Sequence, residues 1–215
     1  AKLPNKEEIY NTLPRCFILY KPMAQVSGDF YFFRKTQKSV YLAAADCTGH
    51  GVPGALLSML CSEKLNSAVL QNYYISEILA QLNKGLKTSL LQSPPEDPAM
   101  DGMDIALCAI DKSTGIIRYA GANRPLWIIR KYGSEVEEIK GTKKTIGGLT
   151  CDRQHFESHE LRFNEGDTFY IFSDGYADMM GGEQGKKLTG KKFKDLLLSI
   201  QHKNMAEQQL HLEEF

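Results

Sequence analysis

Paired cysteines, long apolar runs and an excess of charge of either sign are all missing from this sequence. The five cysteines are odd in number, widely spread and without a C-x-x-C pair, which argues against a disulfide framework and a structural zinc site. No apolar run approaches the ~20 residues of a membrane span, and residues 1–10 lack the apolar core of a signal peptide. We therefore expect a protein of the reducing cytoplasm, without membrane contact by this domain.

Basic and acidic residues balance, with 26 Lys and Arg against 26 Asp and Glu, and no dense basic block occurs. A chain without net charge has no long-range attraction for nucleic acid, so nucleic acid is not expected as a partner. Hydrophobic residues make up 42% of the 215 residues, which is enough for one sizeable core. Residues 1–215 are therefore interpreted as a single domain.

Apolar residues recur with two different periods along the chain. Short or alternating apolar segments predict strands at 16–20, 29–35, 39–46, 103–111, 116–122, 125–132, 135–140, 155–163 and 167–175. Helical spacing predicts helices at 53–69, at 75–90 and at 193–200, the second ended by the prolines of 93–98. We expect a hairpin from 29–46 and a meander from 103–140, which together indicate an antiparallel α+β fold.

Four aspartates stand beside glycine or at the end of an apolar strand: Asp29, Asp46, Asp104 and Asp174. Singly, Asp beside Gly is most often a simple turn. Several carboxylates at the mouth of an apolar core, however, cannot be buried unpaired and need cations between them. Since no basic cluster matches them and the ligands are oxygens alone, we expect the hard ions Mg²⁺ or Mn²⁺ rather than zinc.

The stretch DCTGHGVPGALLSML (46–60) places a glycine-rich turn between a strand and a helix. Gly51, Gly54 and Pro53 favour a sharp turn whose backbone groups point into a site. The flanking glycines indicate that the backbone approaches something closely, so His50 is interpreted as a packing or supporting residue. A role for His50 as metal ligand or general base is the alternative.

Five segments together resemble one protein family. They are VSGDFYFF (26–33), AADCTGHGVPGALLSM (44–59), GMDIALCAID (102–111), YAGANRPLWI (119–128) and LRFNEGDTFYIFSDGYAD (161–178). In this order they resemble the bacterial metal-dependent serine/threonine phosphatases of type 2C, in the branch of the sporulation-stage-II-E and RsbU-like sigma-factor regulators. The resemblance implies a four-layer αββα sandwich, with two antiparallel sheets face to face, helices outside and two Mn²⁺ or Mg²⁺ ions at one end.

The resemblance also implies a role for individual residues. Asp46 resembles the carboxylate that bridges both metals, and the main-chain carbonyl of Cys47 resembles a further ligand. Asp174 resembles the aspartate that binds one of these metals, and Asp29 resembles the one that holds metal-bound water. Two such ions, about 3.5–4 Å apart, orient and acidify a water for in-line attack on phosphorus, so no protein nucleophile is required.

Three positions depart from the family pattern or match it weakly. The family usually has an AGHNPP-like turn where this chain reads AGANRP, so Arg124 is an extra cation that either contacts the substrate phosphate or lies in solvent. Lys21 falls where the family often has a basic residue and is a second candidate for the phosphate. Asp104 stands where many relatives have a hydroxyl residue, and it is a candidate ligand of a third, looser metal or of a water.

The two ends of the chain also differ from the family. Relatives close on a strand with an Asp-Asp pair, one member of which binds a metal, whereas this sequence stops at LHLEEF (210–215). With that carboxylate missing we expect weak metal binding and an impaired enzyme. Residues 1–15 resemble the segment that follows an upstream sensor domain in relatives. A homodimer, in which a partner chain completes the sheet, is left open.

Two functions of different class follow. The first is a phosphatase that removes phosphate from phosphoserine or phosphothreonine on a regulatory protein, for example an anti-sigma-factor antagonist. The second is a catalytically weak or inactive phosphatase-like module used for binding or signalling. The presence of Asp29, Asp46 and Asp174 favours the first.

Overall fold

Five helices are present in the part of the chain that the computed structural model describes, residues 3–22, 24–71, 74–90, 101–178, 180–181 and 186–214. They are α1 (Lys6–Thr12), α2 (Gly51–Gln71), α3 (Ile75–Ser89), α4 (Gly190–Ser199) and α5 (Met205–Glu214). Over these ranges, no helix combines the length and the apolar character that crossing a bilayer requires. The predicted proline break at 93–98 lies outside the described residues.

The strands form two main antiparallel sheets. In the larger, β1 (Phe30–Lys35), β2 (Val40–Cys47), β3 (Gly102–Asp111), β4 (Ile116–Ala122) and β8 (Ser158–Arg162) lie in this order, and β7 (Ile146–Gly147) pairs with β3. The smaller has the order β6 (Glu137–Ile139), β5 (Leu126–Ile129), β9 (Thr168–Tyr170), and β10 (Met180–Gly181) pairs with β11 (Lys186–Lys187). The α+β class and the antiparallel pairing are as predicted.

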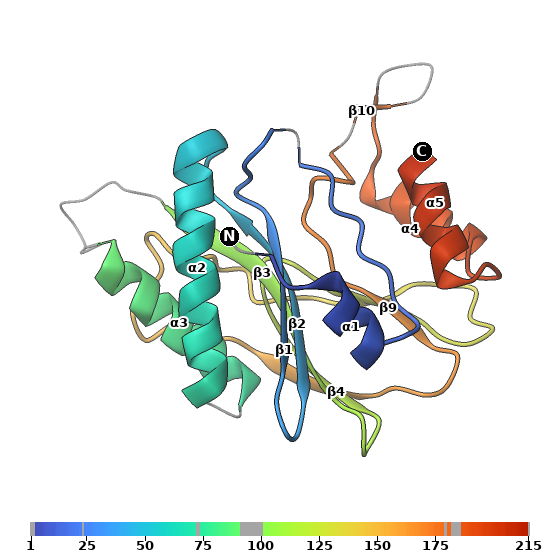
Figure 1. Ribbon diagram of the computed structural model, residues 1–215, viewed down its shortest axis with the longest axis horizontal. Coiled ribbons are helices and arrows are strands. Elements are labelled where there is room, and N and C mark those ends of the chain that lie inside the picture. The colour runs from blue at the N-terminus through green and yellow to red at the C-terminus, as the bar shows by residue number, and fades with distance from the viewer. Residues whose placement is uncertain are drawn as a thin grey trace.

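Side chains of β3 alternate between two hydrophobic clusters because successive residues of a strand point to opposite faces. Ile105 and Leu107 belong to a cluster with buried residues of α2 and α3. Ala106 and Cys108 belong to a second one, the central cluster, with residues of β5 and α1. Figure 1 shows α2 and α3 on one side of the strands and α4 and α5 on the opposite side. The central strand β3 is therefore buried on both faces, whereas the edge strand β8 has one exposed face.

β5 alternates in the same way. Leu126 and Ile128 join the central cluster, whereas Trp127 and Ile129 join a third, C-terminal cluster with residues of α4 and α5. All four residues of this short strand are buried. Both sheets thus contribute one face to the central cluster. Residues that lie on these two faces at the ends of the strands border the cluster, and we call this border its rim.

The hairpin predicted from 29–46 is confirmed, since β1 and β2 pair antiparallel from Phe30 opposite Ala45 to Lys35 opposite Val40. The strand predicted at 16–20 is wrong, because this segment forms no strand. Its side chains pack alternately against the central and the C-terminal clusters. The alternation that suggested a strand therefore comes from burial on two sides, without ladder hydrogen bonds.

The meander predicted from 103–140 is also wrong. β3 pairs with β4 in the larger sheet, but β5 pairs with β6 and β9 in the smaller one. The chain changes sheet at residues 123–125, where Asn123 has a left-handed φ of 59° and Pro125 has no N–H for a ladder. This crossing, which the apolar pattern does not reveal, places Arg124 at the end of both sheets.

Two buried polar side chains of α3 hold the segment that follows β7. Asn83 is fully buried, its Nδ2 donates to the carbonyl of Cys151 at 2.9 Å, and its Oδ1 accepts the N–H of Gly147 at 2.8 Å. Lys87, also buried, donates from Nζ to the carbonyl of Thr150. Together these bonds tie α3 to the end of β7 and to residues 150–151, so the helix helps to fix the path of this segment.

Replacing Asn83 by Leu is expected to lower the free energy of unfolding by about 1–3 kcal/mol, because two main-chain groups lose a buried hydrogen-bond partner. Urea denaturation followed by circular dichroism measures the change. Lys84→Ala, an exposed neighbour on the same helix, is the matched control and should change the free energy by less than about 0.5 kcal/mol. Equal effects of the two substitutions would contradict the assigned role of Asn83.

Candidate metal centre

The predicted acidic residues meet at one end of the larger sheet. The antiparallel register pairs Asp46 of β2 directly with Asp104 of β3. β1 begins opposite Ala45, so Asp29, the residue before β1, lies beside the same end. Asp104 is two residues from Ala106 and hence on the sheet face that lines the central cluster. Alternation and register together direct these carboxylates to the rim shared by both sheets.

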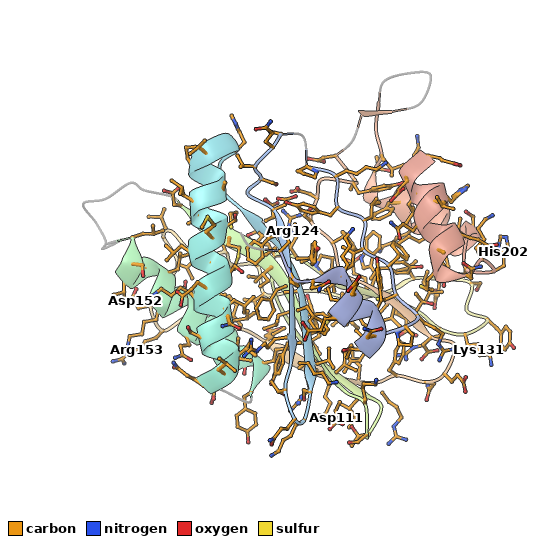
Figure 2. All side chains as sticks on the ribbon, in the orientation of Figure 1. Asp111, Arg124, Lys131, Asp152, Arg153 and His202 are labelled. Atoms are coloured by element: carbon orange, nitrogen blue, oxygen red, sulfur yellow. The ribbon has the colours of Figure 1, made fainter. Side chains whose placement is uncertain are left out.

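Arg124 lies at the centre of this acidic group. Its Nη2 is 2.7 Å from Oδ2 of Asp46, 2.7 Å from Oδ2 of Asp174 and 3.5 Å from Oδ2 of Asp104. The side chain is only 14% exposed, so the prediction that Arg124 lies in solvent is wrong. Figure 2 shows Arg124 at the end of the strands remote from Asp111. One guanidinium thus neutralises residues of β2, β3 and the segment after β9.

Asp29 is oriented by hydroxyl groups. The Oγ of Ser173 donates to Oδ2 of Asp29 at 2.9 Å, and the main-chain N–H of Asp29 donates to Oγ of Ser27 at 3.0 Å. Tyr20 donates from its hydroxyl to the Asp29 carbonyl at 3.1 Å. Ser173 and Tyr20 thus hold Asp29 from two other parts of the chain, and Ser27 holds it from within its own segment.

Crowding of negative charge perturbs Asp46 most. Burial, followed by the charges of Asp29 and Asp174, raises its pKa to about 7, and Arg124 only partly opposes this. For Arg124, burial alone would lower the pKa, but the hydrogen bond and charge of Asp174 outweigh it and the net shift is upward. Several carboxylates therefore face a single guanidinium, and such crowding of like charge is typical of a functional site that takes a cation.

Close backbone packing fixes the turn between β2 and α2. A Cβ on Gly28 would lie 2.9 Å from the carbonyl oxygens of Cys47 and Gly49, and one on Gly54 would lie 2.4 Å from that of Gly49. Gly49 itself has a left-handed φ of 83°. The turn is thus held between two side-chain-free positions, which explains the glycines of the motif in terms of close approach.

Two sequence interpretations concern side chains of this turn. His50 is exposed, so the interpretation of His50 as a packing residue is wrong. The hydrogen bond to the thiol of Cys61, followed by burial, raises the pKa of the Cys47 thiol well above its usual range. A thiol that stays protonated is a poor ligand for a hard ion, so the main-chain carbonyl is the donor that Cys47 offers.

Two residues of the site were missed by the sequence analysis. Asn123 donates from Nδ2 to Oδ1 of Asp104 at 2.8 Å, and Ser173 holds Asp29 as described. Each directly precedes a residue that the sequence had singled out, Arg124 and Asp174, which was the available signal. Lys21, in contrast, is directed to the C-terminal helix, where its Nζ donates to the carbonyl of Glu213 at 3.0 Å.

The donors present fit a hard divalent cation, since carboxylate and carbonyl oxygens are the ligands that Mg²⁺ and Mn²⁺ prefer. The guanidinium of Arg124 lies among these carboxylates and supplies a positive charge at the position where a metal cation would lie. Over the described ranges, no group of three or more His, Cys, Asp or Glu residues is placed so that it could hold a metal ion. The carboxylates are instead arranged around Arg124.

Comparisons with known proteins agree with this architecture. The family model described as stage II sporulation protein E (SpoIIE) matches residues 36–212. The SiaA-PP2C domain of Pseudomonas aeruginosa is 30% identical, with a TM-score of 0.86 over 99% of this chain and 82% of that one.

Two curated proteins of Bacillus subtilis (strain 168) are also similar. The phosphoserine phosphatase RsbU is 28% identical over 159 residues, which are 73% of this chain and 44% of RsbU. The phosphoserine phosphatase RsbP is 23% identical over 173 residues, 80% of this chain and 42% of RsbP. The chain thus spans less than half the length of these two relatives. With most of its length matched by the family model, this chain belongs to the stage II sporulation protein E (SpoIIE) family.

Proposed function

We propose that this chain is a metal-dependent serine/threonine phosphatase that hydrolyses phosphoserine or phosphothreonine on a regulatory protein. The observation that carries the proposal is the convergence of Asp46, Asp174 and Asp29 on one rim, where burial and mutual repulsion raise the pKa of Asp46 to about 7. The chain belongs to the SpoIIE family and is similar to two phosphoserine phosphatases, RsbU and RsbP, which supports the same reaction.

The residues present supply a ligand set for two Mn²⁺ or Mg²⁺ ions. We assign Asp46, Asp174 and the carbonyl of Cys47 as direct ligands, Asp29 as a residue that holds coordinated water, and Asp104 as a looser ligand. When bound, such ions activate water for in-line attack and neutralise the phosphate oxygens. RsbX, which shares the fold at 16% identity and a TM-score of 0.65, has been crystallised in complex with magnesium.

Hydrogen bonds within the chain position these groups in advance. Ser173 and Asn123 orient Asp29 and Asp104 through single side-chain hydrogen bonds, at 2.9 and 2.8 Å. Such supporting bonds fix the direction of carboxylate lone pairs before the substrate arrives. Arg124, on the same rim, is our candidate for the substrate phosphate because a guanidinium matches phosphate geometry. Lys21 is a weaker candidate, because its Nζ donates to the Glu213 carbonyl of α5 and would have to leave this bond to reach the phosphate.

We further place this site at one end of a four-layer αββα sandwich, within one phosphatase domain. The three hydrophobic clusters support that order. One lies between α2, α3 and the larger sheet, the central cluster lies between the two sheets, and the C-terminal cluster lies between the smaller sheet and α4 and α5. All five cysteines are free thiols, which supports a reducing compartment such as the cytoplasm. An upstream sensor domain and an anti-sigma-factor antagonist as substrate are the proposed partners, by analogy with the RsbU-like proteins.

A phosphatase-like module without catalysis is the second candidate function. The observation that favours it is the salt bridge between Arg124 and the two carboxylates of Asp46 and Asp174, which supplies a cation without any metal. A module of this kind would keep the fold for binding alone. The next two experiments separate the two functions.

Asp46→Asn is expected to lower Mn²⁺-dependent release of phosphate from a phosphoserine peptide by at least about 100-fold, because even residues that only support metal ligands change activity by 10–100-fold. Release of inorganic phosphate at saturating Mn²⁺ is the measurement. Asp111→Asn is the matched control, because Asp111 caps a turn at the far end of β3 and should retain full activity. Equal activity of both variants would remove Asp46 from the site.

Treatment with EDTA is expected to abolish phosphate release, and added Mn²⁺ or Mg²⁺ should restore it, because oxygen ligands select hard ions. Zn²⁺ at the same concentration is the comparison and should restore less activity. Phosphate release that persists in EDTA would contradict a metal-dependent mechanism. Absence of release under every metal condition, with Mn²⁺ binding intact, would favour the non-catalytic module.

A further inference from the structure

The backbone of Arg124 is anchored independently of its guanidinium. The hydroxyl of Tyr119 donates to the Arg124 carbonyl, and the Arg124 N–H donates to the carbonyl of Ala122 at 2.8 Å. A Cβ on Gly121 or Gly141 would lie 2.3 or 2.8 Å from the Arg124 carbonyl oxygen, so neighbouring chain packs directly against it. Any change in the contacts of Arg124 is therefore confined to its side chain.

The guanidinium makes its carboxylate contacts through one nitrogen. Nη2 is the atom that contacts Asp46, Asp104 and Asp174. Nε is buried and has no hydrogen-bond partner among the described residues. A buried N–H donor without a partner costs free energy, so this arrangement is less favourable than the number of its ion pairs suggests.

The same carboxylate oxygens cannot serve two cations at full strength. Oδ2 of Asp46 and Oδ2 of Asp174, each 2.7 Å from Nη2, belong to the two proposed metal ligands. A divalent ion bound to them would lie within a few ångströms of the guanidinium, and like charges at such distances repel strongly in a half-buried site. Asp174 is 52% exposed, so its contact with Arg124 can open without unfolding of the core.

We propose that Arg124 is an exchangeable counter-ion of the carboxylates, which it neutralises in the metal-free protein and releases when a divalent cation binds. This inference rests on the proposed metal site, and it assigns to Arg124 the role of lowering the affinity of that site for metal. Metal binding and the Arg124 salt bridges then compete for the same carboxylate oxygens, and each weakens the other by the same free energy, as linkage requires. The released guanidinium is available for the phosphate of a substrate.

Replacement of Arg124 by Met is expected to tighten Mn²⁺ binding about 5- to 150-fold, the range of typical coupling between linked sites. Isothermal titration calorimetry on the whole chain measures the dissociation constant without substrate. In EDTA the variant should melt at a lower temperature than the wild type, because the carboxylates lose their counter-ion. Saturating Mn²⁺ should raise its melting temperature by more than it raises that of the wild type.

Arg130→Met is the matched control. Arg130 also binds two carboxylates, those of Glu137 and Asp167 at 3.0 Å, but it follows the opposite end of β5 from Arg124. Its replacement should lower the melting temperature with and without metal and leave the dissociation constant for Mn²⁺ unchanged. The control distinguishes the general effect of losing two ion pairs from the specific effect of losing Arg124 as counter-ion of the metal ligands.

A measurement on the unmodified chain does not depend on the folding of a variant. The ¹⁵Nε–¹Hε resonance of Arg124 should shift during a Mg²⁺ titration, with the midpoint that calorimetry gives for Mg²⁺, while that of Arg130 should stay in place. An unchanged Arg124 resonance at saturating Mg²⁺, or equal or weaker Mn²⁺ binding by Arg124→Met, would overturn the exchange. Both results leave the proposed phosphatase intact.

The opposite failure is also distinguishable. Tighter metal binding by Arg124→Met, together with a shifted Arg124 resonance but no phosphate release from the peptide, supports the exchange and contradicts the proposed function. If neither the wild type nor the variant binds Mn²⁺ at millimolar concentration, both proposals fail.

Discussion

Repulsion among carboxylates that are partly removed from water is the constraint on which this end of the molecule depends. The register of β2 and β3 puts Asp46 directly opposite Asp104, and the segments before β1 and after β9 bring Asp29 and Asp174 to the same rim. Like charges on facing strand positions destabilise a sheet. The fold tolerates them because a cation, here the guanidinium of Arg124, lies among them.

The rest of the fold keeps these groups at a fixed position with little freedom. Gly28 and Gly54 allow the turn after β2 to pack backbone against backbone, and the crossing at residues 123–125 delivers Arg124 from the larger sheet to the smaller. Central strands buried on both faces, such as β3 and β5, supply rigidity. Hydroxyl and amide groups such as those of Ser173 and Asn123 set the direction of the carboxylates. In the exchange that we propose, such preorganisation would keep the cost of reorganisation low and would link the stability of the metal-free protein to its metal affinity.

Much of this arrangement was accessible from sequence because it depends on local patterns. Alternation predicted the β1–β2 hairpin, and the acidic residues beside glycine pointed to the strand ends that meet in the structure. The segment 16–20 shows the limit of such patterns, since burial on two sides imitates a strand without any ladder. The meander failed for a related reason: β4 and β5 are close in sequence and equally apolar, and nothing in their periodicity says that they belong to different sheets.

The sequence by itself determined which residue types are available to the site: oxygen ligands, a glycine turn, an arginine in place of a neutral turn residue, and an apolar pattern that builds an antiparallel α+β fold. Only the tertiary structure decided that Arg124 enters the acidic group, that His50 faces solvent and that Lys21 reaches the C-terminal helix instead. The physical reason is that periodicity fixes the face on which a side chain lies, whereas the partner it meets depends on chain crossings and register between segments distant in sequence.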